Sequence, residues 1–318
     1  MSRRRLALVT TGVFLIVVAL ASRFYVSPSL VRASLNQSNE SVSRAEGATY
    51  LSIDRTGVSI RTNRAIRAVL EVRGDVAAGS RGVAVWNTYT TVLDDDGRIV
   101  SQSTDRVAMD RRAGTAVRCC EEALNGAPAR HDGLTYKFPF STPRAELQWF
   151  DRTLRTARPI AFRGETRRAG LRVYRFEQVI AETSLGQRSG VPGHLLDRPG
   201  VVDAEHTYAT TRTFWVEPVS GVIVGAEESQ RQLLRTTDGA EAVVLDATFA
   251  LDAKTVAEAV DTARYVQRVV RLLEVIVPLL ACLVGAALLA LGLLRPRPRP
   301  PAPDGRHARD ADEAPVPA

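Results

Sequence analysis

The sequence is poor in the residues that build disulfide scaffolds and common catalytic centres. It has 3 cysteines and 4 histidines in 318 residues, too few for a disulfide framework. Its only lysines are Lys137 and Lys254, and neither stands in the G-K-[ST] form of a phosphate-binding loop. The motifs G-x-S-x-G, H-E-x-x-H, C-x-x-C and G-x-G-x-x-G are also absent. We therefore expect no catalytic, cofactor-binding or metal-binding residues and a protein that is not an enzyme.

The remaining metal-ligand types do not form a convincing site either. His131, His194 and His206 have no metal-ligand spacing, so we expect them to be solvated, although Asp203 and Glu205 lie close to His206 in the sequence. The run of aspartates at 94–96 precedes a glycine. A hydrated hairpin turn explains this run with fewer assumptions than a calcium site does.

Two long uncharged runs bracket the chain and indicate its class. The first extends from Leu6 to Ser22 and the second from Val275 to Leu294. A membrane-spanning α-helix needs about 20 mostly apolar residues. Arginines flank both runs on their outer sides, and basic residues near a span tend to remain in the cytoplasm. We therefore expect a two-pass cell-membrane protein with both termini in the cytoplasm and the central domain outside it.

A cleaved signal peptide is the alternative for the first run. Ala19, Leu20 and Ala21 have the small-x-small form of a cleavage site after a basic start and an apolar stretch. The run is long and continues into Phe24 and Tyr25, which favours an uncleaved anchor. Both alternatives place the large middle region outside the cytoplasm.

The net charge of +7 could indicate a nucleic-acid partner. However, residues 27–264 hold 31 basic and 30 acidic residues, so the excess lies in the flanks of the apolar runs. The basicity therefore reflects membrane topology, and we expect no nucleic-acid partner. The membrane lipid bilayer is the expected partner.

The region between the two runs is rich in β-strand patterns. Alternating and β-branched stretches recur between Gly, Asp and Pro residues, as in "GVAVWNTYTTVL" and "HTYATTRTFWVE". Residues 88–106 and 211–231 each read as a strand, a polar turn closing on Gly97 or Gly221, and a second strand. This similarity suggests two related β-units, although ordinary hairpins can converge on the same pattern.

The pattern changes to a helix after Asp252. Apolar residues recur at spacings of 3 and 4 from Val256 to Leu273, which is the pattern of a helix with a narrow packing seam. The segment after the first apolar run and the β-rich domain are both candidate partners for this seam. A homo-oligomer that forms through the stalk and the membrane helices is also possible.

The fold class that we expect is α+β and membrane-anchored, with a β-rich antiparallel ectodomain between an N-terminal and a C-terminal transmembrane helix. The expected segments are a cytoplasmic N-terminus at 1–5, a transmembrane helix or uncleaved signal anchor at 6–26, a juxtamembrane segment at 27–47, β-rich units at 48–130 and 131–252, a helical stalk at 253–274, a transmembrane helix at 275–294 and a disordered cytoplasmic tail at 295–318.

Three stretches carry a resemblance to a known family. "GLTYKFPF" (133–140), "FRGETRRAGLRVYRFEQ" (162–178) and "FWVEPVSGVIVG" (214–225) lie in this order between a basic N-terminal anchor and a C-terminal span. With these flanks they resemble the actinobacterial envelope proteins of the porin PorA family. The positions that match the family's motifs are Gly133, Pro139, Asp151, Gly164, Gly170, Tyr174, Pro218 and Gly221.

The resemblance implies an envelope location but supplies no catalytic residues. A strand-built pore needs many segments that are apolar outside and polar inside, whereas these strands carry charged faces. The segments 170–176 and 215–221 are also similar to envelope lipoprotein-carrier domains, in which a curved sheet holds a lipid tail. We therefore expect the domain to bind or organise envelope lipid or lipoglycan. An oligomeric channel is the alternative, and an enzyme with an unrecognised active site is the third possibility.

Cys119 and Cys120 are adjacent and lie in the exported region, where thiols are oxidised. Neighbouring Cα atoms are about 3.8 Å apart, closer than most disulfides prefer. A vicinal disulfide, two free thiols and a bond between chains therefore all remain open. Cys282 lies inside the second apolar run.

Overall fold

The computed structural model describes residues 3–55 and 57–294, so the expected tail at 295–318 lies outside the described residues. The chain divides into two compact units. The helix-pair unit contains α1 (Arg3–Ala21) and α4 (Val277–Leu293), and the β-rich unit extends from Ser22 to Ile276. Among the described residues, two helical stretches are long and apolar enough to span a membrane, Arg3–Val26 and Ala253–Leu293.

Glycines allow α1 and α4 to pack closely. A Cβ atom on Gly12 would lie 2.7 Å from the backbone oxygen of Gly285, and one on Gly285 would lie 2.8 Å from that of Gly12. A Cβ on Gly292 would likewise meet the Val9 side chain at 2.7 Å. Small residues that let backbones approach are typical of helix pairs in membranes.

Within the described residues, twelve strands form one antiparallel sheet in the order β6-β5-β4-β3-β2-β1-β12-β11-β10-β9-β8-β7. The strands are β1 (Ser38–Asp54), β2 (Gly57–Gly74), β3 (Val83–Asp94), β4 (Ile99–Asp110), β5 (Ala123–Leu124), β6 (Ala127–Pro128), β7 (Leu147–Asp151), β8 (Thr156–Arg168), β9 (Leu171–Pro192), β10 (Val201–Glu217), β11 (Val222–Arg235) and β12 (Glu241–Leu251). The β-rich antiparallel class expected from the sequence is therefore confirmed.

The strand order places the first and last strands of the chain side by side. β1 pairs with β12 in the middle of the sheet. From this pair, β2 to β6 follow β1 toward one edge, and β11 to β7 follow β12 toward the other edge. The expected hairpins around Gly97 and Gly221 are β3–β4 and β10–β11. β1 begins at Ser38, inside the segment 27–47 that we expected to be juxtamembrane. The polar residues at the start of β1 belong to the sheet because they pair with β2. Duplication of two β-units remains a prediction.

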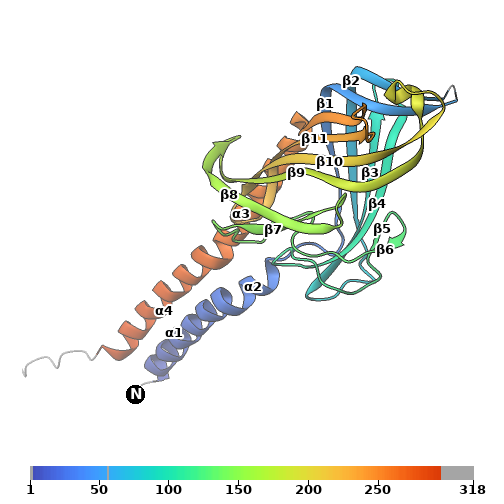
Figure 1. Cartoon of the computed structure of the whole chain (residues 1–318). Coiled ribbons are helices and arrows are strands. Elements are labelled where there is room, and N and C mark those ends of the chain that lie inside the picture. The colour runs from blue at the N-terminus through green and yellow to red at the C-terminus, as the bar shows by residue number, and fades with distance from the viewer. Residues whose placement is uncertain (1–2, 56, 295–318) are drawn as a thin grey trace, which may run out of the picture. The chain divides into compact units, whose positions relative to one another are not determined.

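Backbone hydrogen bonds also connect the two outer parts of the sheet. Val117 N donates to Ala108 O of β4 at 2.8 Å, and Ala116 N donates to Gly133 O at 2.8 Å. Leu134 in turn exchanges two hydrogen bonds of 2.7 Å with Gln148 and Phe150 of β7. The sheet is thus closed at this end through two short extended segments. Figure 1 shows β9 and β10 passing across β3 and β4.

Helical segments complete the β-rich unit. They are η1 (Ser22–Val26), α2 (Ser27–Leu30), η2 (Gly193–Leu196), α3 (Ala253–Arg271) and η3 (Leu272–Ile276). The Asp252 side chain caps α3 by accepting a hydrogen bond from Thr255 N at 2.9 Å. The apolar seam of α3, with Val260 and Ala263 buried, packs on Leu171 and Val224 of the sheet. Of the two partners expected for this seam, the β-rich domain is the one observed.

Candidate functional site

Four of the positions that match the family motifs build the closure of the sheet. Gly221 has a φ of +70°, and a Cβ atom there would lie 2.2 Å from Phe138 O. Gly133 has a φ of +65°, and its Cβ would lie 2.6 Å from Gln148 O. The carbonyls of Pro139 and Pro218 both accept hydrogen bonds from Thr142, at 2.7 and 2.8 Å. These motifs therefore meet because residues 133–142 pack on the β10–β11 turn.

Three further positions lie in the β8–β9 hairpin. Gly164 has a φ of +130° where the register of the two strands shifts, and Gly170 follows Ala169 in the turn, where both residues have positive φ. The Tyr174 hydroxyl accepts a hydrogen bond from Arg144 Nε at 3.0 Å. These contacts shape the hairpin and form no reactive group.

Asp151, the eighth position, lies at the centre of a group that we call the arginine cluster: Asp151, Gln178, Tyr208, Arg212 and Glu228. All of these residues are buried except Glu228, whose side chain is partly exposed. Arg212 Nη1 lies 2.6 Å from Asp151 Oδ2 and donates to Gln178 Oε1 at 2.8 Å. Arg212 Nη2 contacts the Tyr208 hydroxyl and Glu228 Oε1, both at 2.8 Å. The Tyr208 hydroxyl donates to Asp151 Oδ2 at 2.8 Å.

The surroundings of the arginine cluster raise the pKa of Arg212 and of Tyr208. Burial lowers the pKa of Arg212, but Glu228, Tyr208 and Asp151 outweigh this effect and raise it. Burial also raises the pKa of the Tyr208 hydroxyl, which remains a neutral donor. A buried ion pair that is fully hydrogen-bonded in this way fixes geometry and leaves no free nucleophile.

A second buried group, the histidine cluster, contains Thr88, Asp105, Glu122, His131 and Tyr136. His131 Nε2 lies 2.8 Å from Asp105 Oδ1, and its Nδ1 lies 2.7 Å from Glu122 Oε2. The Tyr136 hydroxyl donates to Asp105 Oδ2 at 2.6 Å and lies 2.9 Å from Thr88 Oγ1. Burial lowers the pKa of His131, but the bonds to Asp105 and Glu122 outweigh this effect and raise it.

The expectation that His131 is solvated was therefore wrong. Its side chain has no exposed area, because the segment that carries it folds back over β4 and its two ring nitrogens meet carboxylates from different elements. His194 is exposed and contacts Val58 O, and His206 contacts Gln232. The three histidines thus have separate partners and form no common metal site.

Arg152 lies near charged residues of both clusters. It follows β7, and its Nη1 donates to Thr90 Oγ1 of β3 at 3.1 Å. The nearby Tyr136, Asp105 and Glu228 raise the pKa of Arg152, whereas burial and Arg212 lower it. Arg152 lies among the charged groups of both clusters and still keeps exposed area, so water reaches this residue. We call the two clusters together with Arg152 the polar interior.

Lys137 is a buried amine next to the closure. Its Nζ donates to Phe138 O at 2.6 Å and to Ser220 O at 3.3 Å, and it lies 3.7 Å from the centroid of the Phe140 ring. Burial lowers the pKa of this amine to about 7. It links the 133–140 segment to the β10–β11 turn.

The structure joins Cys119 and Cys120 by a disulfide. Cys120 and Glu121 both have positive φ, and Arg106 Nε donates to Cys120 O at 3.0 Å. The bridge therefore lies in the loop that presents Glu122 to His131. Cys282 is free.

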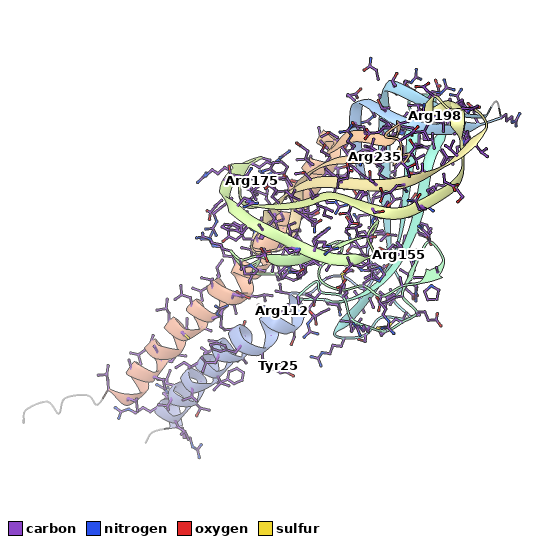
Figure 2. All side chains as sticks on the ribbon, in the orientation of Figure 1. Tyr25, Arg112, Arg155, Arg175, Arg198 and Arg235 are labelled. Atoms are coloured by element: carbon purple, nitrogen blue, oxygen red, sulfur yellow. A yellow bond between two sulfur atoms is a disulfide. The ribbon has the colours of Figure 1, made fainter. Side chains whose placement is uncertain are left out.

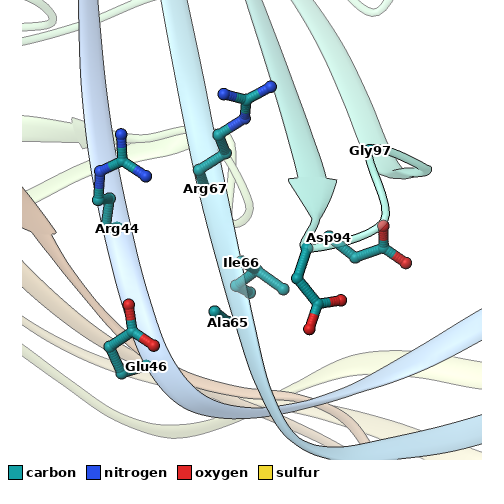
Figure 3. Close-up of a pocket in the computed structure, with 8 residues that line it drawn as sticks. Arg44, Glu46, Ala65, Ile66, Arg67, Asp94 and Gly97 are labelled. Atoms are coloured by element: carbon teal, nitrogen blue, oxygen red, sulfur yellow. The ribbon is translucent and has the colours of Figure 1, made fainter.

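Two pockets in the described part of the chain are lined mainly by polar and charged residues. One has a volume of about 290 Å³, and Figure 3 shows Arg44 and Arg67 on neighbouring strands beside it, with Asp94 near Gly97. The second is lined by residues 38–40 and 71–73, mostly polar or charged. Neither has the apolar lining that a lipid tail requires.

The aspartates at 94–96 converge, as a cation site would require, but their hydrogen bonds explain them without an ion. Asp94 Oδ1 accepts hydrogen bonds from the backbone of Asp96 and Arg98, and Arg64 lies 2.6 Å from Asp95. The hairpin-turn interpretation accounts for these contacts.

The comparisons with known proteins agree with the motifs. The family model described as Porin PorA matches residues 6–294. The chain is 29% identical over 113 residues to "Porin PorA" of Corynebacterium resistens. This alignment covers 31% of this chain and 27% of the relative. The chain is also 25% identical over 187 residues to "Porin PorA" of Corynebacterium amycolatum. This second alignment covers 46% of this chain and 48% of the relative. The match to each relative thus spans less than half of that relative's length. The family model covers nearly the whole chain, and the chain therefore belongs to the Porin PorA family.

Proposed function

We propose that this chain is a non-enzymatic membrane protein of the cell envelope that assembles with copies of itself into a porin-type channel. Both termini would lie in the cytoplasm, and the β-rich unit would lie outside the membrane at the mouth of the channel. The names of the two relatives support this function. They favour the channel, the alternative that the sequence left open, over lipid or lipoglycan binding.

The single observation that carries the proposal is the position of Arg152. It is accessible to water, yet it lies among charged groups from both parts of the closed sheet. A charged side chain that lines a water-filled path creates the local field that selects ions in a pore, and the exposed Arg152 could act in this way. A protein that only anchors a domain to the membrane would not need these charged groups around Arg152.

The helices indicate why several chains are needed. α1 and α4 carry no charged residue between Leu6 and Ala21 or between Val277 and Leu293, and one apolar helix pair cannot surround a water-filled path. In the apolar part of α1, from Leu6 to Ala21, the polar side chains are Thr10 and Thr11, and both are exposed. We propose that these hydroxyls face the path when helix pairs from several copies assemble.

The test uses the purified full chain in planar lipid bilayers and in nanodiscs. The proposal predicts discrete conductance steps that are absent without protein, and a particle mass of several copies by mass photometry. The double variant T10V/T11V has nearly the same side-chain volume and keeps the fold of the β-rich unit, so it should assemble and conduct less. A monomer that produces no conductance would contradict the proposal.

A further inference from the structure

The disulfide between Cys119 and Cys120 lies at one end of a chain of contacts that reaches the histidine cluster. Both cysteines are partly exposed, and Cys120 Sγ lies 3.8 Å from Ala78 O in the turn after β2. Arg112, labelled in Figure 2, lies in the segment that leads from β4 to this bridge. A reductant in the surrounding water can therefore reach the bond, whereas the His131 side chain beyond it has no exposed area.

The bridge holds the backbone in a conformation that its residues rarely adopt. Cys120 has a φ of +67° and Glu121 has a φ of +58°, and the Cβ atom of each makes this left-handed region unfavourable. A disulfide between neighbours closes a small ring through the peptide group that joins them, so it restricts rotation at the N–Cα bond of Cys120. Without the bond both residues can relax to negative φ, which changes the direction of the chain directly before Glu122.

Arg106 ties the carbonyl of Cys120 to the sheet. Its Nε donates to Cys120 O at 3.0 Å, its Nη1 to Asn87 Oδ1 at 2.8 Å and its Nη2 to Asp75 Oδ2 at 3.0 Å. The guanidinium group thus connects β3, β4 and the turn after β2 with the bridge. Because rotation of the Cys120 backbone would turn its carbonyl away from Arg106, this hydrogen bond belongs to the oxidised form.

Glu122 carries the same change into the histidine cluster. Its Oε2 accepts a hydrogen bond from His131 N at 2.9 Å and lies 2.7 Å from His131 Nδ1. The Glu122 side chain is 7% exposed, so water does not replace these contacts in the folded chain. Since one residue separates Glu122 from the bridge in the sequence, a shift of the Cys120 backbone moves Glu122 relative to His131.

We propose that the Cys119–Cys120 disulfide is a reversible redox switch that a dithiol reductant opens, and that its opening releases Glu122 from His131. Neighbouring Cα atoms are closer than most disulfides prefer, which makes such a bond easier to reduce. The β-rich unit has no third cysteine, so the reductant comes from outside this unit. The inference does not depend on channel activity.

The reaction is thiol–disulfide exchange. A thiolate of the reductant attacks one of the two sulfur atoms, and the other sulfur leaves as a thiolate. The second thiolate of the reductant then attacks its own sulfur in the mixed disulfide and releases the second cysteine. The reductant becomes a disulfide and the two cysteines become thiols, which take up the protons that the thiols of the reductant gave up.

The equilibrium of this reaction tests the link to His131. The full chain, with the free Cys282 removed as C282A, is held in nanodiscs in mixtures of reduced and oxidised dithiothreitol. Thiols are then blocked with iodoacetamide and counted by intact mass. Glu122 favours the oxidised form through its bonds to His131, so E122Q should raise the equilibrium constant for reduction about tenfold. The matched control E121Q changes the neighbouring exposed carboxylate and should leave the constant unchanged.

Hydrogen exchange of the C282A chain is a second readout that needs no change in the histidine cluster. After reduction the backbone N–H groups of residues 120–131 should exchange faster, because the His131 N–H group loses its acceptor. Residues 133–140 should keep their exchange rates, because their hydrogen bonds reach β7 and the β10–β11 turn. Tryptophan fluorescence checks that the β-rich unit stays folded in both redox states.

Three results would overturn the proposal. The first is an equal equilibrium constant for E122Q and E121Q, which would show that the bridge and the histidine cluster are not coupled. The second is unchanged exchange of residues 120–131 after reduction. The third is a bond that dithiothreitol reduces only when the chain is unfolded, since a switch has to open in the folded protein.

Discussion

Asp151 and Arg212 lie 2.6 Å apart in the interior of the β-rich unit, 61 residues apart in the sequence. The Asp151 side chain has no exposed area and the Arg212 side chain has 10%. β7 thereby becomes tied to β10 by a charge pair that has left water. Removal of Asp151 leaves the buried Arg212 with the partly exposed Glu228 as its remaining carboxylate partner among the described residues, so this contact should contribute strongly to the stability of the interior.

The first prediction concerns this pair. The substitution D151N should lower the free energy of unfolding by about 3–5 kcal/mol, measured by denaturant unfolding. All 3 tryptophans (Trp86, Trp149 and Trp215) lie in the β-rich unit, so their fluorescence follows this unit alone.

The matched control for D151N is D238N, which breaks the exposed pair of Asp238 with Arg198 at 2.6 Å. It should cost less than about 1 kcal/mol. The double variant D151N/R212M should regain part of the loss, because it removes both charges. An equal cost for D151N and D238N would contradict the account of the interior.

The second prediction is a pH dependence that arises from His131. Its folded pKa is raised above the usual value of 6.5, so its contribution to stability is complete below that pH and is lost as the pH rises through the folded pKa. The stability difference between the wild type and H131Q should therefore be largest near pH 6 and shrink toward pH 9. H194Q, which removes an exposed histidine, is the control. A difference that stays constant from pH 6 to 9 would show that His131 is neutral.

Lys137 gives the third prediction, with the opposite sign. In the folded chain burial lowers its pKa to about 7 from the ordinary 10.5, so the unfolded chain holds more protons between these values and stability rises with pH there. K137M should remove this rise. K254M is the control, because the Lys254 side chain is 82% exposed. If the free energy of unfolding depends on pH in the same way in K137M and K254M, the amine of Lys137 is not buried as described.

The fourth prediction tests the closure of the sheet. G221A should destabilise the β-rich unit by more than G97A does, although both glycines have similar φ values of +70° and +78°. A Cβ at Gly97 meets nothing within 4 Å, so only the backbone strain of about 1–2 kcal/mol applies. At Gly221 the same atom would collide with the backbone of the 133–142 segment. Equal costs for the two variants would show that this segment is not packed on the turn.

Local sequence patterns predicted the helices and hairpins, because these elements form between residues that are close together in the sequence. The two apolar helices followed from the length of uncharged runs, and the hairpins at Gly97 and Gly221 followed from turn residues between alternating stretches. The α3 seam also followed from its spacing, although its partner remained open.

The polar interior could not be predicted in this way. Asp151 was noted from a family motif, but Arg212 and Tyr208 gave no signal, because their contacts depend on strand pairing across distant parts of the chain. His131 was misassigned for the same reason. Its Gly- and Asp-rich surroundings are typical of an exposed loop, and only the return of this loop over β4 buries it against Asp105.

The central claim is that this chain assembles into a channel and that ions pass Arg152 on their way through it. The most direct measurement is the reversal potential of the current through channels that the full chain forms in a planar bilayer under a salt gradient. This potential is compared between the wild type, R152Q and the control R175Q. If Arg152 borders the path, loss of its positive charge will shift selectivity toward cations, whereas R175Q will leave it unchanged. Conducting channels whose reversal potential is the same in all three proteins would contradict the claim.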